Sequence, residues 1–222
     1  MGMVYACKDR ELGGRLSAMK VLFSEVARDE IAAARFRNEI VSSYEINHPH
    51  VVRAFDYLRD GEFVAFTMEY VGGGDLADKI GADEPLQITE IIRMLRQMCS
   101  GVQAIHDAGI IHRDLKPENV LLSYPNGDFS QMPSRVVLVD FGLVGIGGFA
   151  FDPHPNLTRS KVTMGTVNYM APEQHVDAKR VDFRSDLYSC GVILFEMLTG
   201  DLPLGRYLMP SERETTAAIP QA

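Results

Sequence analysis

The sequence predicts an α+β protein with two unequal lobes: a small antiparallel β lobe with one main helix and a larger, mainly helical lobe. In residues 1–70, short apolar or alternating runs separated by turn signals indicate strands. The stretch VGGGDL at 71–76 then breaks the pattern, as a flexible connector would. Helical periodicity dominates the remainder, so we expect the lobes to divide at 1–70 and 71–222.

Two strand pairs are expected in the small lobe. The runs MVYACKD at 3–9 and SAMKVLF at 17–23 flank ELGG, which is typical of a turn. The runs VVRAFDYL at 51–58 and FVAFTMEYV at 63–71 flank Asp60–Gly61, a tight-turn signal. Each pair therefore predicts a hairpin.

One helix is expected between these hairpins. Phe36, Ile40 and Tyr44 recur at helical spacing, which predicts a helix from about Asp29 to Asn47.

Two long helices are expected in the large lobe. Thr89 is a suitable N-cap and Gly109 a suitable C-cap for the first. Its apolar stripe would be formed by Ile92, Leu95, Met98, Val102 and Ile105. The second, SDLYSCGVILFEMLTG at 185–200, is apolar nearly all round, so we expect it to begin at its serine, end at its last glycine and be buried on most sides. Short strands are predicted at 119–122 and 135–140.

Composition excludes several classes of protein. A net charge of −8 over 222 residues and a pI near 5.2 argue against a nucleic-acid-binding surface. Three widely separated cysteines form neither a disulfide framework nor a metal-ligand pattern, which favours a reducing compartment. No apolar run reaches the ~18 residues of a membrane span. We therefore expect a cytoplasmic chain without a membrane segment of its own, although it could be the cytoplasmic part of a larger, membrane-anchored protein.

The candidate chemistry is concentrated in IHRDLKPENVLL at 111–122. Phosphoryl transfer requires an acid that orients a hydroxyl, a cation near the moving phosphate and oxygen ligands for magnesium. Asp114, Lys116 and Asn119 can supply one of each. A polar loop capped by its own Asp and Asn is the alternative for these residues.

With this loop, four other motifs follow the order found in protein kinases. AMK ends at Lys20, RFRNEI contains Glu39, DFG occupies 140–142 and GTVNYMAPEQ occupies 165–174, while the last apolar helix starts near Asp186. Over nearly its whole length the sequence resembles a eukaryotic-like (Hanks-type) serine/threonine protein kinase catalytic domain of bacterial type. The resemblance implies a two-lobe kinase fold.

The resemblance implies a catalytic role for four residues. Lys20 would bind the α- and β-phosphates of ATP while paired with Glu39, Asp114 would orient the substrate hydroxyl, and Lys116 would neutralise the γ-phosphate. Lys20 and Glu39 could instead form a surface ion pair worth under about 1 kcal/mol.

The resemblance also implies that ATP and Mg²⁺ are the cofactors. Asn119 and Asp140 would hold the metal, the backbone of Glu69 and Val71 would meet the adenine edge, and Asp75 would reach the ribose. Met68 falls at the gatekeeper position, and Val4, Ala18 and Leu121 would sandwich the base. The full nucleotide set is Gly2, Val4, Ala18, Lys20, Met68, Glu69, Val71, Asp75, Leu121 and Asp140.

Regulation and substrate class are also implied. Arg113 next to Asp114 needs an anion, which a phosphorylated activation segment often supplies in this family. Thr158, Ser160 and Thr163 are the candidate autophosphorylation sites, and two copies of the chain could form a dimer for this step. Thr166 would shape a pocket for a serine or threonine of a protein substrate.

The sequence departs from the family pattern at both ends and in one hairpin. MGMVY resembles the end of the glycine-rich loop, with Gly2 as its third glycine, and the other two glycines are not in the sequence. After Gly200 there is little room for the family's last helices, so we expect a domain truncated at both ends. SYPNGDFSQMPSR at 123–135 would form a long hairpin tip that turns at Asn126–Gly127 and projects into solvent. A truncated pseudokinase or scaffold fragment is the main alternative; a small-molecule kinase is disfavoured because GTVNYMAPEQ resembles a platform for protein substrates.

Overall fold

The computed structural model describes residues 2–11, 13–23, 37, 40, 44, 46–61, 63–82, 84–141, 168–176 and 181–203. In the small lobe it forms one four-stranded antiparallel sheet in the order β1-β2-β4-β3. The strands are β1 (Gly2–Lys8), β2 (Leu16–Leu22), β3 (Ala54–Asp60) and β4 (Phe63–Glu69). Both predicted hairpins are present, whereas the helix predicted at 29–47 lies mostly outside the described residues.

The sheet register brings the candidate nucleotide residues together. Across β1 and β2, Val4 pairs with Lys20 and Ala6 pairs with Ala18. On the other edge of β2, Ala18 pairs with Met68 of β4. Since paired residues point to the same face of a sheet, small and apolar side chains from three strands share one surface.

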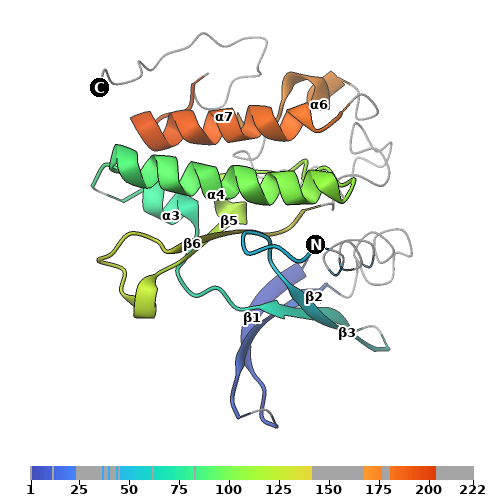
Figure 1. The fold of residues 1–222 in the computed structure, drawn as a ribbon. Helices are drawn as coiled ribbons and strands as arrows, with labels where there is room; N and C mark the ends of the chain where they lie inside the picture. The colour runs from blue at the N-terminus through green and yellow to red at the C-terminus, as the bar shows by residue number, and fades with distance from the viewer. Residues whose placement is uncertain are drawn as a thin grey trace.

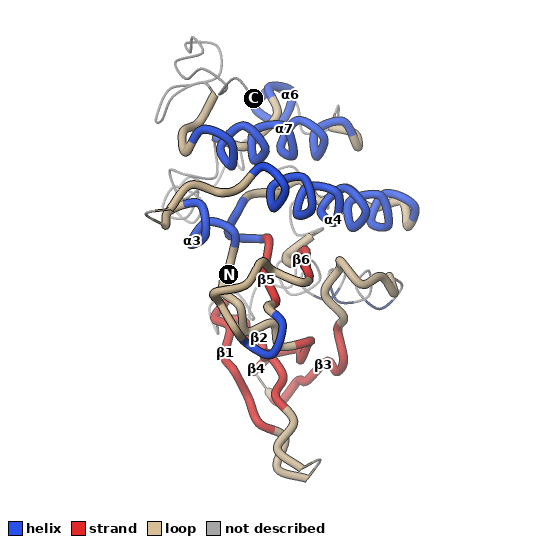
Figure 2. The backbone as a smooth tube through the Cα atoms, turned by 60° about the vertical axis from the view of Figure 1, so that its left-hand side comes forward, coloured by secondary structure: helices blue, strands red, loops and turns tan. Residues whose placement is uncertain are grey.

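The large lobe consists of helices above a short hairpin. Its elements are α3 (Leu76–Ile80), α4 (Ile88–Asp107), η1 (Pro117–Asn119), β5 (Val120–Ser123), η2 (Pro125–Gly127), β6 (Arg135–Leu138), α6 (Pro172–Val176) and α7 (Arg184–Thr199). In Figure 1, α7 lies on α4, the β5–β6 hairpin lies below α4, and the small-lobe sheet lies below the hairpin. Figure 2 shows the same order from another side, so the hairpin separates the helices from the sheet.

Backbone hydrogen bonds fix the two lobes to each other at this hairpin. Val52 donates to the carbonyl of Leu138 at 2.9 Å, and Leu138 donates to the carbonyl of His50 at 2.9 Å. The VGGGDL connector is also packed against the hairpin, because a Cβ on Gly73 would lie 2.1 Å from the carbonyl oxygen of Leu122. A glycine is therefore needed here for close approach.

Three details of the helix predictions are wrong. α4 begins at Ile88, because the carbonyl of Gln87 accepts from Glu90 and Ile91, so Thr89 is not its N-cap. The predicted stripe is wrong only in its first turn, where Ile92 is 51% exposed and Ile91 and Met94 are buried instead; Leu95 is partly buried, and the predicted Met98, Val102 and Ile105 are buried. The N-cap of α7 is Phe183. The predicted cap, Ser185, lies within the first turn, and its hydroxyl donates to the main-chain carbonyl of Asp182.

The end of α7 and the hairpin tip agree with prediction, and the end of α4 differs by one residue. Gly200 is the C-cap of α7, whereas the C-cap of α4 is Ala108 and the predicted Gly109 follows it. Both glycines are left-handed, with φ of 75° for Gly109 and 74° for Gly200. Asn126 and Gly127 both have positive φ at the tip, where Phe129 is 63% exposed. None of the described helices combines the length and the apolar character that crossing a membrane requires.

Candidate active site

The loop after α4 is fixed by a buried carboxylate on α7. Asp186 is fully buried and accepts hydrogen bonds from the backbone N–H groups of His112 and Arg113, both at 2.8 Å. The Nε2 of His106, in the last turn of α4, lies 2.7 Å from the same carboxylate. Arg113 has a φ of 65°, a left-handed conformation in which a side chain is unfavourable. Asp186 therefore stabilises a strained backbone directly before Asp114.

Asp114, Lys116 and Asn119 converge in this loop. The Nζ of Lys116 lies 3.1 Å from the Oδ2 of Asp114. The Nδ2 of Asn119 donates both to that oxygen at 3.1 Å and to the main-chain carbonyl of Asp114 at 2.7 Å. The carboxylate is thus oriented from two sides by a cation and an amide.

A second charged pair spans the lobes. The Nζ of Lys20 lies 2.6 Å from the Oδ1 of Asp140, and Lys20 is buried. The backbone N–H of Val139 donates to the carbonyl of Asn119 at 3.0 Å, so Asp140 directly follows a residue bonded to the Asp114 cluster. The cluster of Asp114, Lys116 and Asn119 and the charged pair of Lys20 and Asp140 are therefore neighbours in one candidate site.

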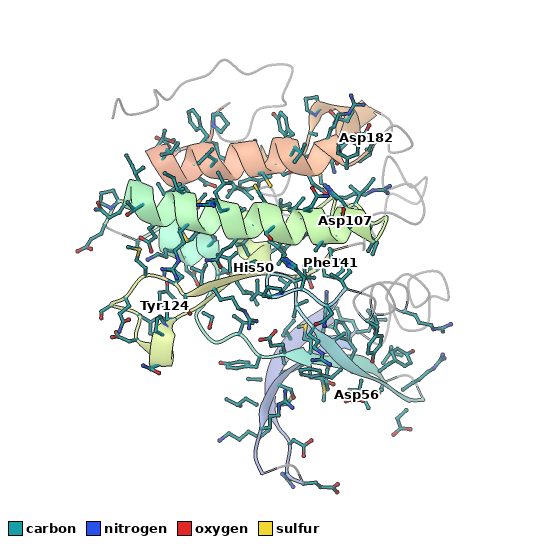
Figure 3. The ribbon with its side chains drawn as sticks, in the orientation of Figure 1. His50, Asp56, Asp107, Tyr124, Phe141 and Asp182 are labelled. Atoms are coloured by element: carbon teal, nitrogen blue, oxygen red, sulfur yellow. The ribbon has the colours of Figure 1, made fainter. Side chains whose placement is uncertain are left out.

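An apolar layer lies beside these charges. His112 is fully buried, and its ring is 6.3 Å from that of Phe141, which lies between α4 and the small-lobe sheet (Figure 3). Burial lowers the pKa of the His112 imidazole below its ordinary value, although nearby carboxylates, chiefly Asp186 and then Asp114, act in the opposite direction. The ring is therefore neutral at physiological pH.

A cavity of about 210 Å³ opens between the sheet and the hairpin. Six predicted nucleotide residues line it: Val4, Ala18, Met68, Glu69, Val71 and Leu121. The prediction missed five others: Tyr5, Ala6, Val52, Tyr70 and Val139. Val139 directly precedes the DFG motif and was the one most accessible to sequence reasoning; the others depend on strand register. The side chain of Glu69 pairs with Arg135 at the start of β6, which holds the end of β4 against the hairpin.

Two other predicted nucleotide residues do not line this cavity. Gly2 pairs with Leu22 at the end of β1, where a Cβ would lie 2.1 Å from the carbonyl oxygen of Val21. Asp75 is the N-cap of α3, and its Oδ1 accepts from the N–H of Asp78 at 2.9 Å. The remaining predicted site residues lie outside the described residues: Glu39, Thr158, Ser160, Thr163 and Thr166.

Asn119 and Asp140 have donor atoms that suit magnesium. The amide nitrogen of Asn119 is used by Asp114, which leaves its Oδ1 as the atom for a cation. Asp140 adds a partly exposed carboxylate. In the described part of the chain no group of three or more His, Cys, Asp or Glu side chains could hold a metal. Mg²⁺ prefers oxygen ligands and often takes only one or two from protein, with phosphate and water as the rest, so these two residues fit it.

The two lobes, the oriented Asp114 and the cavity between sheet and hairpin define the protein kinase class, and the comparison with known sequences agrees. A family model described as "Protein kinase domain" matches residues 1–219, so the chain belongs to this family. It is 37% identical over 206 residues to Serine/threonine-protein kinase pkn3 of Myxococcus xanthus. It is also 37% identical to Probable serine/threonine-protein kinase PknB of Lactococcus lactis and 34% identical to Serine/threonine-protein kinase PknB of Mycobacterium leprae.

Each of these three alignments covers 91% of this chain. They cover 36%, 30% and 31% of the respective relatives, so the chain spans about a third of their length.

Proposed function

We propose that this chain is a serine/threonine protein kinase domain, which transfers the γ-phosphate of ATP to hydroxyl groups of protein substrates in the cytoplasm. The observation that carries the proposal is the Asp114 carboxylate, oriented by Lys116 and Asn119 in a loop that Asp186 fixes. The identities to bacterial proteins named serine/threonine-protein kinases support the substrate class.

The apolar cavity suits a nucleotide base. Its volume of about 210 Å³ is below the ~300–1,000 Å³ of pockets that enclose a drug-sized ligand, as expected if it holds the base alone. Ala18 and Leu121 line it from the small and the large lobe respectively. The phosphates would then extend toward Lys20, whose ammonium group would bind the α- and β-phosphates. The resemblance assigns Lys20 an ion-pair partner in Glu39, which lies outside the described residues.

Asp114 accepts the hydrogen bond of the substrate hydroxyl and directs its oxygen toward the γ-phosphorus. Lys116, already in contact with Asp114, offsets the negative charge on the phosphoryl oxygens. Asn119 and Asp140 would hold Mg²⁺, which when bound neutralises charge on the phosphates. Positioning and charge stabilisation together account for most of the rate in such a reaction.

The proposal is tested by phosphate transfer from radiolabelled ATP to a generic protein substrate. Asp140→Asn should lower the rate about a thousandfold or more, because an anionic ligand beside the phosphates is lost. Gln131→Glu, a charge change at an exposed hairpin position, should leave the rate unchanged. Equal rates in Asp140→Asn and the parent would refute the role of Asp140. ATP binding without transfer in the parent would instead favour a scaffold.

Regulation by autophosphorylation is part of the proposal. The Nε of Arg113 is buried and has no hydrogen-bond partner among the described residues, which suits an arginine that awaits an anion. We expect phosphate on Thr158 or Ser160, added by a second copy of the chain, to order the segment and raise activity. Mass spectrometry after incubation with ATP and Mg²⁺ should find it there. A Thr158→Ala, Ser160→Ala double variant with unchanged activity would remove this role.

A further inference from the structure

Gln174 connects the end of the activation segment to the catalytic loop. Its Nε2 donates to the main-chain carbonyl of Arg113 at 2.9 Å. Its Oε1 accepts from the backbone N–H of Ala171 at 2.9 Å, directly before α6. One side-chain amide thus bonds two backbone segments that lie about 60 residues apart in the sequence.

The contact with Ala171 alone does not require glutamine. A glutamate at the third position of a helix accepts from the N–H before the helix equally well, and its charge interacts favourably with the helix N-terminus. A glutamate, however, has no N–H to give to the carbonyl of Arg113. Only the bond to the carbonyl of Arg113 therefore requires the amide of glutamine at this position.

That bond acts on the peptide unit that carries Asp114. The carbonyl of Arg113 and the N–H of Asp114 belong to the same planar group, so holding one fixes the direction of the other. Arg113 has a φ of 65°, and its own N–H is held by Asp186 at 2.8 Å. Asp186 and Gln174 therefore hold this strained residue on its N-terminal and C-terminal sides respectively.

We propose that Gln174 is a positioning residue for Asp114, acting through the peptide between Arg113 and Asp114. The inference rests on the proposed kinase function for its consequence, since a displaced Asp114 would misdirect the substrate hydroxyl. It does not involve the nucleotide cavity, which Gln174 does not line. Substitution of Gln174 should therefore lower the rate of phosphate transfer while leaving the affinity for ATP nearly unchanged.

The test uses Gln174→Glu, which keeps the acceptor for Ala171, and Gln174→Met, an uncharged variant of similar length that loses both bonds. In both, kcat for a protein substrate should fall about fivefold or more, whereas the KM for ATP should stay within about twofold. The melting temperature of Gln174→Glu should fall by no more than about 2–4 °C, because one hydrogen bond is lost while the contact with Ala171 is kept. Amide hydrogen exchange over residues 110–116 should accelerate in both variants.

Gln97→Glu is the matched control. Gln97 also bridges two backbone groups, with its Oε1 2.8 Å from the N–H of Val136 and its Nε2 3.5 Å from the carbonyl of Ser134, but these lie at β6. This variant should keep parental kcat and parental exchange over 110–116.

Parental kcat and exchange in Gln174→Glu would overturn the inference, as would a larger fall in melting temperature with faster exchange throughout the protein. A parent that transfers no phosphate would refute the proposed function instead. In that case, faster amide hydrogen exchange over residues 110–116 in the Gln174 variants would still support the positioning role, and parental exchange would refute it.

Discussion

The imidazole of His112 has no exposed surface, and neither of its nitrogens has a hydrogen-bond partner among the described residues. Burying an unpaired polar group costs free energy, and burying it charged would cost more. The neutral ring is therefore the only form that the folded protein accommodates easily, which makes the backbone next to Asp114 sensitive to acid.

Stability should decrease as the pH falls from about 7 to 5.5. Unfolded His112 binds a proton near its ordinary pKa of about 6.5, while burial keeps the folded pKa lower. The unfolded state then binds more protons below pH 6.5, so the free energy of unfolding falls with pH. Urea unfolding across this range should show a shallower pH dependence for His112→Leu than for the parent. Identical slopes would contradict a buried neutral His112.

At the scale of single residues, the sequence predicted that Asp114, Lys116 and Asn119 share one loop, and it predicted part of the cavity lining. Asp114, Lys116 and Asn119 lie within six residues, so local chain geometry is enough to bring them together. Tyr5 and Val52 reach the same cavity from β1 and from the segment before β3, and their place depends on a strand register that one sequence does not display. The hydrogen bonds of Gln174 were missed because its partner, Arg113, is distant in the chain.

At the scale of single elements, the effect of adding a side chain depends on how closely the backbone at that position approaches its neighbours. The connector between β4 and α3 touches the hairpin at Gly73, where no side chain fits. The exposed Gly191 in α7 presents the opposite case, since a Cβ there would meet nothing within 4 Å.

Two alanine substitutions should therefore have opposite effects. Gly73→Ala should lower stability by about 2–3 kcal/mol, because the connector or β5 must shift. Gly191→Ala should raise it by about 0.5–1 kcal/mol, because alanine has less backbone freedom to lose in a helix. Thermal melting should show a decrease of several degrees and an increase of about 2 °C, respectively. A Gly73→Ala variant that melts with the parent would mean that the connector does not pack closely on β5.

Element types were easier to predict than element boundaries. The predicted stripe of α4 was one residue out of phase in its first turn, at Ile92 and Leu95, because apolar residues occur there on two adjacent lines of the helix and only packing selects one; its later members, Met98, Val102 and Ile105, were predicted correctly. The predicted Thr89 and Ser185 caps were wrong because the N-caps are the earlier residues Gln87 and Phe183, neither of which makes a side-chain capping bond. Glycines after the helices were predicted correctly, because a positive φ is a local requirement.

In the whole molecule, the candidate site is assembled from both lobes. β1, β2 and β4 provide one wall of the cavity, and Leu121 and Val139 provide the other. Lys20 of the small lobe contacts Asp140 of the large lobe. The order of the motifs predicted this two-lobe arrangement because each motif occupies a fixed place in the family fold, whereas the segment that contains Thr158 and Thr166 is outside the described residues.

A ligand that fills this cavity should stabilise both lobes together. A nucleotide that binds only the folded state stabilises it by about 2.7 kcal/mol at a concentration 100 times its Kd. For a protein of this size, that should raise the melting temperature by about 5–10 °C in a single transition. Ala18→Leu places a larger side chain in the cavity wall and should abolish most of the increase with ATP and Mg²⁺, whereas its melting temperature without nucleotide should stay close to the parent's. An increase in Ala18→Leu equal to that of the parent would show that the base binds elsewhere.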